Sequence, residues 1–131
     1  MSQRGERQPP YRPLYTWPPP VRRVLEALLI HRPHQMYLFG SWARGEADDL
    51  SDVDVVIILE STQPFLERLL SIGRSLPLEL GAVDLFAYTP EEWAQMKASG
   101  NIFVQMVMEE GVLVYDETQE RGSTVVPTST G

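Results

Sequence analysis

The spacing of apolar residues divides the chain into helices and strands. In residues 20–31 and 64–75, apolar side chains recur three and four positions apart, which predicts two amphipathic helices. Four shorter runs are rich in apolar and β-branched residues and predict strands, at residues 35–39, 52–59, 81–88 and 112–115. In the second helix we expect four apolar side chains to face the core, namely Phe65, Leu66, Leu69 and Leu70.

Capping signals place the remaining helices. Residues 41–47 follow the first strand and are expected to form a short helix or turn. Residues 89–92, Thr-Pro-Glu-Glu, combine an N-cap, a proline in the first turn and a capping-box glutamate, so they begin a helix that ends near Gly100. Asn101 then caps a further helix, which Gly111 ends.

The order of these elements predicts the fold class. Helices and strands alternate as α-β-α-β-α-β-α-α-β, which indicates an α/β (α+β) domain with a mixed central sheet of about four strands flanked by helices. A length of 131 residues fits one domain. We expect a proline-rich arm over residues 1–19, the domain over residues 20–116, and a flexible tail over residues 117–131.

Composition narrows the class of partner. The chain has no cysteine, which excludes disulfides and cysteine zinc sites and is compatible with a cytoplasmic protein. No apolar run approaches the roughly 20 residues that cross a bilayer, so no membrane association is expected. The net charge of −7 divides into +4 over residues 1–35 and −11 over the remainder. Such an acidic body repels a phosphate backbone, so no polynucleotide partner is expected.

Acidic residues stand at the beginning of apolar strands. Asp52 and Asp54 are two positions apart, so their side chains point to the same face of a strand. Paired carboxylates repel each other unless a cation lies between them, and carboxylate oxygens are the ligands that Mg²⁺ prefers. Asp84 occupies a similar position in the next strand and would add a third carboxylate if the two strands are neighbours. Three carboxylates can hold two divalent ions for phosphoryl or nucleotidyl transfer.

A glycine and a serine precede these acids. Gly40 follows the first strand, where it allows a sharp turn and the close approach of a ligand, and Ser41 adds a hydroxyl at a helix start suited to phosphates. Trp42 could stack on a base, although such a residue more often packs in the core. Two other phosphate-binding motifs do not fit this sequence. It contains no Gly-Lys-Ser/Thr, which a P-loop requires. Its aspartates precede the apolar strand, whereas those of a haloacid dehalogenase-type phosphatase follow it.

The motif resembles that of a known family. Gly40-Ser41, ten intervening residues and Asp52-Val53-Asp54 are similar to the pattern of the minimal nucleotidyltransferase (MNT) family, within the DNA polymerase beta superfamily. The resemblance covers roughly residues 20–116 and implies that Gly40, Ser41 and Arg44 bind the nucleotide. It also implies that Asp52, Asp54 and Asp84 hold two Mg²⁺ ions, with Asp84 helping to deprotonate the acceptor.

The resemblance further implies an activity and a partner. We expect an enzyme that transfers AMP from ATP, or NMP from another nucleoside triphosphate, to a hydroxyl group. Small members of the family resemble antitoxins that modify a helical HEPN-type toxin with AMP, which would make this chain a protein adenylyltransferase in a toxin–antitoxin system. The aromatic residues Tyr11, Tyr15 and Trp17 of the arm could bind such a partner. The alternative is a non-catalytic antitoxin or binding module with a vestigial nucleotide site.

Overall fold

A four-stranded mixed sheet forms the centre of the computed structural model, which describes residues 8–120. The strands lie in the order β3-β2-β1-β4. β1 is antiparallel to both β2 and β4, whereas β2 and β3 are parallel and joined by a helical crossover. This arrangement confirms the predicted fold class. The strands are β1 (Gln35–Phe39), β2 (Val53–Ile58), β3 (Val83–Tyr88) and β4 (Val112–Asp116).

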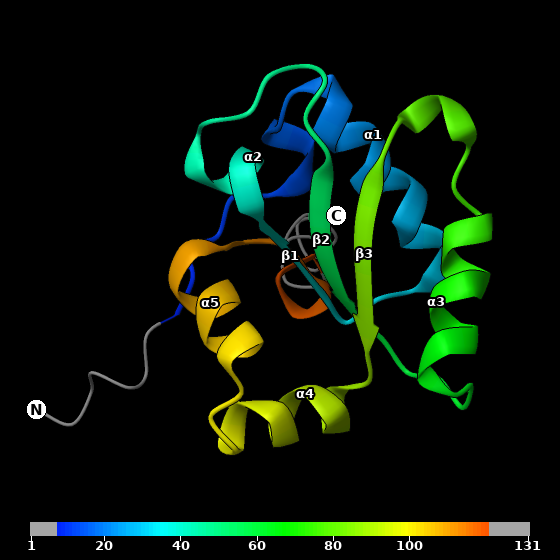
Figure 1. Ribbon diagram of the computed structural model, residues 1–131, viewed down its shortest axis with the longest axis vertical. Helices are drawn as coiled ribbons and strands as arrows, with labels where there is room; N and C mark the ends of the chain where they lie inside the picture. Colours follow the sequence, from blue (N-terminus) through cyan, green and yellow to red (C-terminus); the bar gives the residue numbers. More distant parts are fainter. Residues whose placement is uncertain (1–7, 121–131) are drawn as a thin grey trace, which may run out of the picture.

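Helices cover both faces of this sheet (Figure 1). α1 and α3 pack on one face of the sheet, and α4 and α5 pack on the other. None of the helices between residues 8 and 120 combines the length and apolar character needed to cross a bilayer. The helices are α1 (Pro19–Leu28), α2 (Gly40–Arg44), α3 (Phe65–Arg74), α4 (Pro90–Ala98) and α5 (Ile102–Glu110).

The alternation of side chains along the strands creates two hydrophobic cores. On the side of α1 and α3, Val53, Val55 and Ile57 of β2 pack with the buried residues of α1. On the side of α4 and α5, Val56 and Ile58 pack with residues of those two helices. Because neighbouring strand residues point to opposite faces, one strand supplies both cores.

The predicted helix caps are confirmed. The Thr89 hydroxyl accepts a hydrogen bond from the Glu92 backbone N–H, and the Glu92 carboxylate accepts one from the Thr89 N–H, which together form a capping box. The Asn101 side chain accepts from the Val104 N–H at the start of α5. These bonds satisfy backbone donors that have no partner within their own helix.

The prediction for the buried face of α3 is wrong at three of its four positions. Phe65, Leu66 and Leu70 are exposed at 36%, 69% and 55%, whereas the buried residues of the helix are Arg68 and Ile72. Arg68 can occupy an interior position because its guanidinium donates to the Glu92 carboxylate at 2.7 Å and to the Ala87 carbonyl at 2.9 Å. A buried charge is tolerated when it is paired and hydrogen-bonded in this way.

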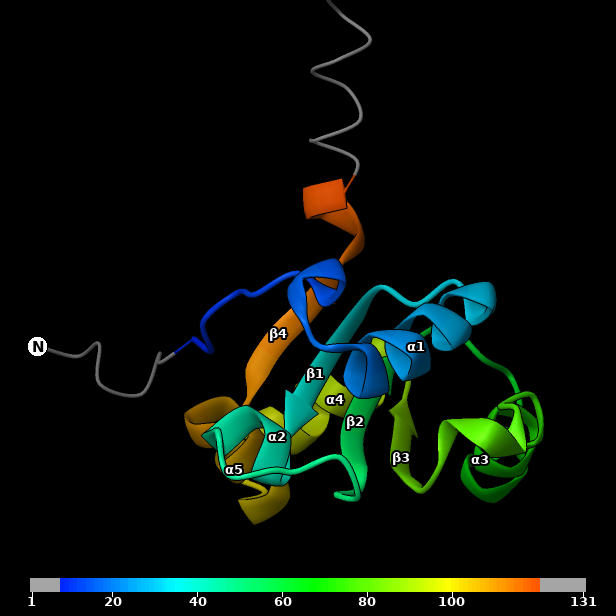
Figure 2. The ribbon, with the colours of Figure 1, turned by 90° about the horizontal axis from the view of Figure 1, so that it is seen from above.

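Part of the predicted arm belongs to the folded domain. Trp17 is buried in the core on the α1 side, and the Arg12 guanidinium lies 3.8 Å from the centre of its ring. Tyr11 forms a parallel bridge with Leu113, so this segment runs beside β4 (Figure 2). Contrary to the prediction from the sequence, Trp17 is therefore not available to a partner, whereas Tyr11 and Tyr15 are exposed. The predicted tail lies outside the described residues from position 121 onward.

The Arg68–Glu92 pair yields a stability prediction. Replacing Arg68 with Ala should lower the free energy of unfolding by about 3 kcal/mol, because the change leaves the partners of a buried guanidinium without a donor. Glu92→Gln should cost less, since that side chain is partly exposed and keeps an acceptor for the Thr89 N–H. Urea unfolding followed by circular dichroism would measure both. Equal stability of Arg68→Ala and the wild type would contradict this account.

Candidate active site

Two carboxylates lie opposite each other where β2 and β3 begin. In the parallel register, Asp54 is the direct partner of Asp84. Both side chains lie on the sheet face that carries α4 and α5, since the next same-face residues, Val56 and Phe86, pack in that core. We predicted that Asp84 would lie beside Asp52 and Asp54 if the two strands are neighbours. The strands are neighbours, and Asp84 lies beside Asp54.

Gly40 lies directly against Asp54. β1 and β2 are antiparallel, and the last residue of β1, Phe39, pairs with Asp54, which brings the following turn onto the carboxylate. A Cβ at position 40 would overlap Asp54 Oδ2 and lie 2.9 Å from its Cγ. Gly40 also has a φ of +75°, in the left-handed region that favours glycine. Two independent constraints therefore require glycine here.

The environment of Asp54 disfavours its charged form. Burial raises its pKa to about 6, and the Asp84 carboxyl adds to the effect by hydrogen bonding and by its negative charge. The charge of Asp52 acts in the same direction, and Arg44 opposes it weakly. A pair of carboxylates strained by mutual repulsion is relieved by a cation, so the donor chemistry fits a divalent metal ion.

One open cleft unites the residues that the sequence selected. Its volume is about 620 Å³, and it holds all six predicted site residues, which are Gly40, Ser41, Arg44, Asp52, Asp54 and Asp84. Four further lining residues were not selected: Phe39, Leu50, Ser51 and Met106. Phe39 directly precedes the motif, and Leu50 and Ser51 lie within it. Met106 comes from α5 and reaches the cleft only through the tertiary fold. The roles of all these residues in binding remain predictions.

The acidic residues do not yet form a closed metal site. Within the part of the chain that the structure describes, no three His, Asp or Glu side chains are grouped closely enough to hold an ion together. Asp52 precedes β2 and is exposed, whereas Asp54 is half-buried. Asp54 and Asp84, which are paired across β2 and β3, form the centre of the site, and Asp52 would complete it.

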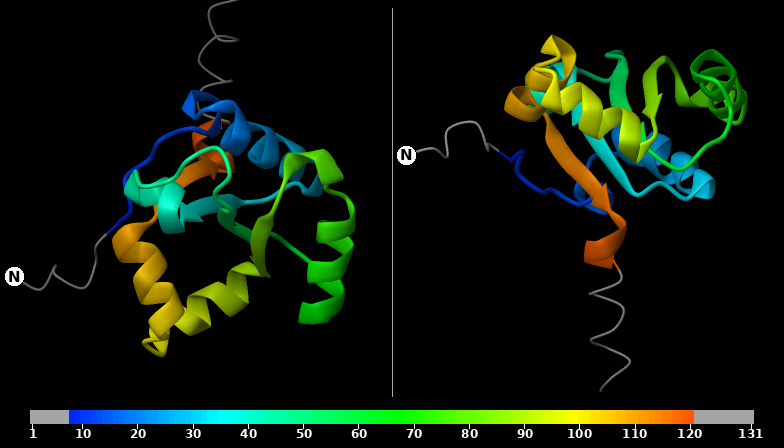
Figure 3. Two further views of the ribbon diagram at one scale, coloured as in Figure 1. Left: turned by 45° about the horizontal axis from the view of Figure 1, so that its top comes forward. Right: turned by 90° about the horizontal axis from the view of Figure 1, so that it is seen from below.

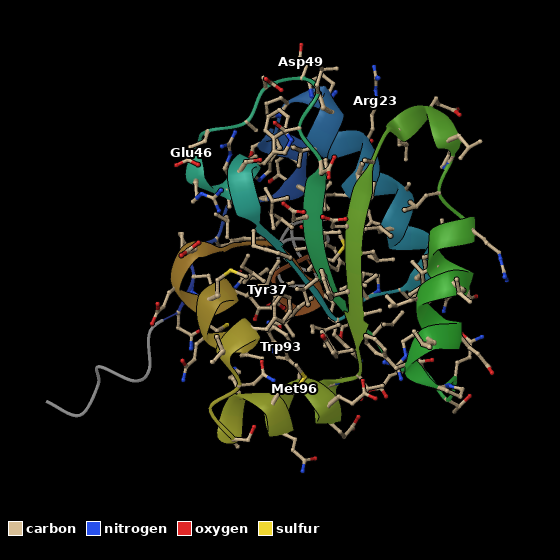
Figure 4. All side chains as sticks on the ribbon, in the orientation of Figure 1. Arg23, Tyr37, Glu46, Asp49, Trp93 and Met96 are labelled. Carbon is tan, nitrogen blue, oxygen red and sulfur yellow. The ribbon has the colours of Figure 1, made fainter. Side chains whose placement is uncertain are left out.

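Arg44 lines the cleft but is held by acidic neighbours. Its Nε donates to Glu46 at 3.0 Å, and Nη1 lies 3.8 Å from Glu110. These carboxylates raise the Arg44 pKa above its usual value. Glu46 lies on the loop that follows α2, and Asp49 lies further along the same loop (Figure 4). Contact between Arg44 and a phosphate would require exchange of these exposed ion pairs, which are individually weak.

Trp42 packs rather than facing the cleft. Its ring is partly buried against the core on the α1 side, as expected, and it does not line the cleft. Its Nε1 is buried and has no hydrogen-bond partner among residues 8–120. Base stacking by Trp42 is therefore not supported by its position.

Comparison with known proteins identifies the class of this fold and site. Residues 21–108 match the model of the nucleotidyltransferase domain, and the chain belongs to that family. A search of curated protein sequences finds no match. The conclusion on family therefore rests on the domain match.

Two solved structures align with this chain, and the one with a TM-score above 0.5 shares its fold. A chain of a toxin–antitoxin crystal structure with AMP-PNP aligns with a TM-score of 0.53 and 22% identity, covering 82% of each chain. A candidate nucleotidyltransferase from Sulfolobus solfataricus aligns with a TM-score of 0.48 and 22% identity over 72% of this chain and 74% of that one.

The contact between Gly40 and Asp54 can be tested with a matched glycine. Gly45 has a φ of +76°, like Gly40, but a Cβ there would have no atom within 4 Å. Both Gly→Ala variants should lose about 1 kcal/mol of stability through backbone strain. Gly40→Ala should in addition displace Asp54 and weaken Mg²⁺·ATP binding by at least about tenfold, measured by calorimetry. Equal nucleotide affinity in the two variants would show that the close approach of Gly40 has no role in binding.

The raised pKa of Asp54 predicts a pH-dependent stability. Its folded pKa of about 6 exceeds the ordinary value of 3.8, so the metal-free protein loses stability as the pH rises through this interval. Asp54→Asn should therefore raise the melting temperature above pH 7 by about 4 °C, with little change near pH 4. Differential scanning calorimetry in the presence of a chelator would measure it. Added Mg²⁺ should stabilise the wild type but not the variant, and a gain that is the same at both pH values would refute the assignment.

Proposed function

We propose that this protein is a Mg²⁺-dependent nucleotidyltransferase that moves the nucleoside monophosphate of a nucleoside triphosphate, ATP in the first place, to a hydroxyl group. The observation that carries the proposal is the opposition of Asp54 and Asp84 beside the Gly40-Ser41 turn in a single cleft. Membership in the nucleotidyltransferase family supports the reaction class. The choice of ATP follows from the resemblance to minimal nucleotidyltransferases.

Each side of the cleft has its own task in this proposal. Asp52, Asp54 and Asp84 would hold Mg²⁺, which when bound neutralises charge on the triphosphate and on the pyrophosphate that leaves. The Gly40-Ser41 turn offers backbone N–H groups, a hydroxyl and the space for close approach of phosphate oxygens. Catalysis would thus consist mainly of positioning and charge neutralisation.

The transfer step is a substitution at the α-phosphorus. The acceptor oxygen forms a bond to this phosphorus while the bond between the phosphorus and the oxygen that bridges the α- and β-phosphates breaks, and pyrophosphate leaves with that oxygen. The acceptor proton passes to a carboxylate beside the attacking oxygen. Asp84 is assigned this role because it is the more exposed member of the Asp54–Asp84 pair. A base must lie within hydrogen-bond reach of the proton that it removes.

We further propose that the acceptor belongs to a small helical partner of the HEPN type, so that the protein acts as a cytoplasmic antitoxin. The resemblance to minimal nucleotidyltransferases motivates this, and the fold shared with a chain of a toxin–antitoxin structure is compatible with it. Residues 8–120 form the sheet and the helices that pack on it, and they include no second lobe that could enclose an acceptor. A partner that carries the hydroxyl would supply that missing surface.

Label transfer tests the activity. Incubation with α-labelled ATP, Mg²⁺ and the protein encoded beside this one should give a partner that is heavier by one AMP in mass spectrometry. Asp52→Ala combined with Asp54→Ala should lower transfer by on the order of 10³-fold, because the charge on the triphosphate is no longer neutralised. Asp49→Ala is the matched control, since Asp49 is an exposed acid of the same loop that does not line the cleft.

Two outcomes would contradict the proposal in different ways. Undiminished transfer by the double variant would exclude these carboxylates from the mechanism. Tight association with the partner but no Mg²⁺·ATP binding at millimolar concentration would instead establish the alternative, a non-catalytic antitoxin with a vestigial site.

A further inference from the structure

Aromatic side chains extend from the candidate active site along β3. Asp84, Phe86 and Tyr88 alternate along this strand and therefore share one face of the sheet. Asp84 is the proposed base, so the two aromatic residues continue the surface on which an acceptor would lie. Five aromatic residues form what we call the aromatic strip: Phe39, Phe86, Phe103, Tyr88 and Phe65.

The strip is continuous from ring to ring. Phe39, which lines the cleft, lies 5.9 Å from Phe86 between ring centres, and Phe86 lies 4.9 Å from Phe103. Tyr88 lies 6.4 Å from Phe103 and stacks on Phe65 of α3 at 5.4 Å. These separations are typical of aromatic pairs in contact. The strip thus links the cleft to the beginning of α3 without a break.

The strip is only partly covered by the rest of the domain. Phe39 is buried at the cleft end of the strip, Phe86, Tyr88 and Phe103 are partly buried, and Phe65 is 36% exposed. α4 and α5 meet at an angle along one side of this face (Figure 3), and their side chains bury Val56 and Ile58 of β2 but leave Phe86 and Tyr88 of β3 partly accessible. The proposed reaction leaves this apolar surface unused, although it begins at the reacting group.

A shallow pocket lies at the far end of the strip. It has a volume of about 240 Å³ and is lined by Phe65, Tyr88, Glu92, Gln95 and Met96. Met96 lies on α4, below the lower ends of β2 and β3 in Figure 4. A cavity of roughly 150 Å³ is enough for benzene, so this pocket can receive one aromatic side chain.

We propose that the aromatic strip binds the segment of the partner protein that carries the acceptor hydroxyl, in an extended conformation, with a large apolar side chain in the pocket beside Phe65. Tyr88 is four residues beyond Asp84 along β3, a distance of about 13 Å at the rise of an extended strand. The apolar residue therefore stands about four positions from the acceptor residue. This inference rests on the proposed function and assigns its acceptor-binding surface.

Charge indicates what else the acceptor segment contains. The described residues include eight basic and 17 acidic side chains, so the domain as a whole is acidic. A segment with arginine or lysine on either side of its apolar residues complements this net charge, whereas a nucleic acid strand is repelled by it. The occupant is thus a basic, aromatic-containing peptide segment.

Synthetic peptides provide the direct test. We would use labelled 12-residue peptides with one tyrosine, arginine at both ends, and phenylalanine four positions before or after the tyrosine. The remaining positions are glycine and serine, and a matched peptide carries serine in place of the phenylalanine. Fluorescence anisotropy in the presence of Mg²⁺ and a non-hydrolysable ATP analogue should show that one phenylalanine peptide binds at least about tenfold more tightly than its serine counterpart, as burial of a phenylalanine predicts.

Matched variants locate the binding surface. Phe65→Ser and Met96→Ser should each remove most of the preference for phenylalanine. Leu70→Ser is the control, because Leu70 is an exposed apolar residue of the same helix, at 55%, that does not line the pocket. Melting temperatures of all three variants would verify that each is folded.

The outcomes separate this inference from the proposed function. Failure of every peptide to bind, equal binding of the phenylalanine and serine peptides, or an equal loss in Leu70→Ser and Phe65→Ser would overturn the assignment of the strip. None of these results depends on transfer. If calorimetry shows no Mg²⁺·ATP binding while the peptide preference is present, the proposed reaction fails and the strip stands as a protein-binding surface.

Discussion

The opposition of Asp54 and Asp84 is the constraint to which the rest of the site is fitted. Parallel pairing of β2 and β3 places the two carboxylates side by side, and partial burial makes their joint ionisation unfavourable. Gly40 has no side chain where the Asp54 carboxylate lies, so the turn after β1 closes onto it. A domain of this size retains a repulsive pair only because the surrounding sheet is independently stable.

That stability comes from the opposite face of the sheet. The core between the sheet, α1 and α3 contains the fully buried residues Val21, Leu25 and Ile57, and even the segment before α1 contributes Trp17. The other face carries a second core, the acidic cleft and the aromatic strip. Because alternate residues of β2 serve both faces, the strand that anchors the first core also positions Asp54.

The same division gives a physical basis for recognition of an acceptor. The cleft is acidic and open, which suits a metal-bound triphosphate but offers little shape for a specific acceptor. The strip beyond Asp84 is apolar and partly exposed, and burial of such a surface is a general source of binding free energy. Because the cleft and the aromatic strip are separate, the cleft would carry out the transfer while the strip selects the acceptor protein.

The sequence by itself determined the main helices and strands of the fold and six of the ten residues that line the cleft. Local signals are sufficient for this, since capping residues such as Thr89 and Asn101 and the alternation within β2 act over a few positions. The spacing of Asp52 and Asp54 also implied a shared face before any strand pairing was known. Tertiary structure decided what depends on contacts between distant segments. It opposed Asp54 to Asp84, turned α3 so that Arg68 rather than Leu66 is buried against Glu92, and placed Trp17 in the core. It also brought Met106 to the cleft and Phe65 onto Tyr88, because side chains far apart in sequence meet only when the sheet and its helices pack together.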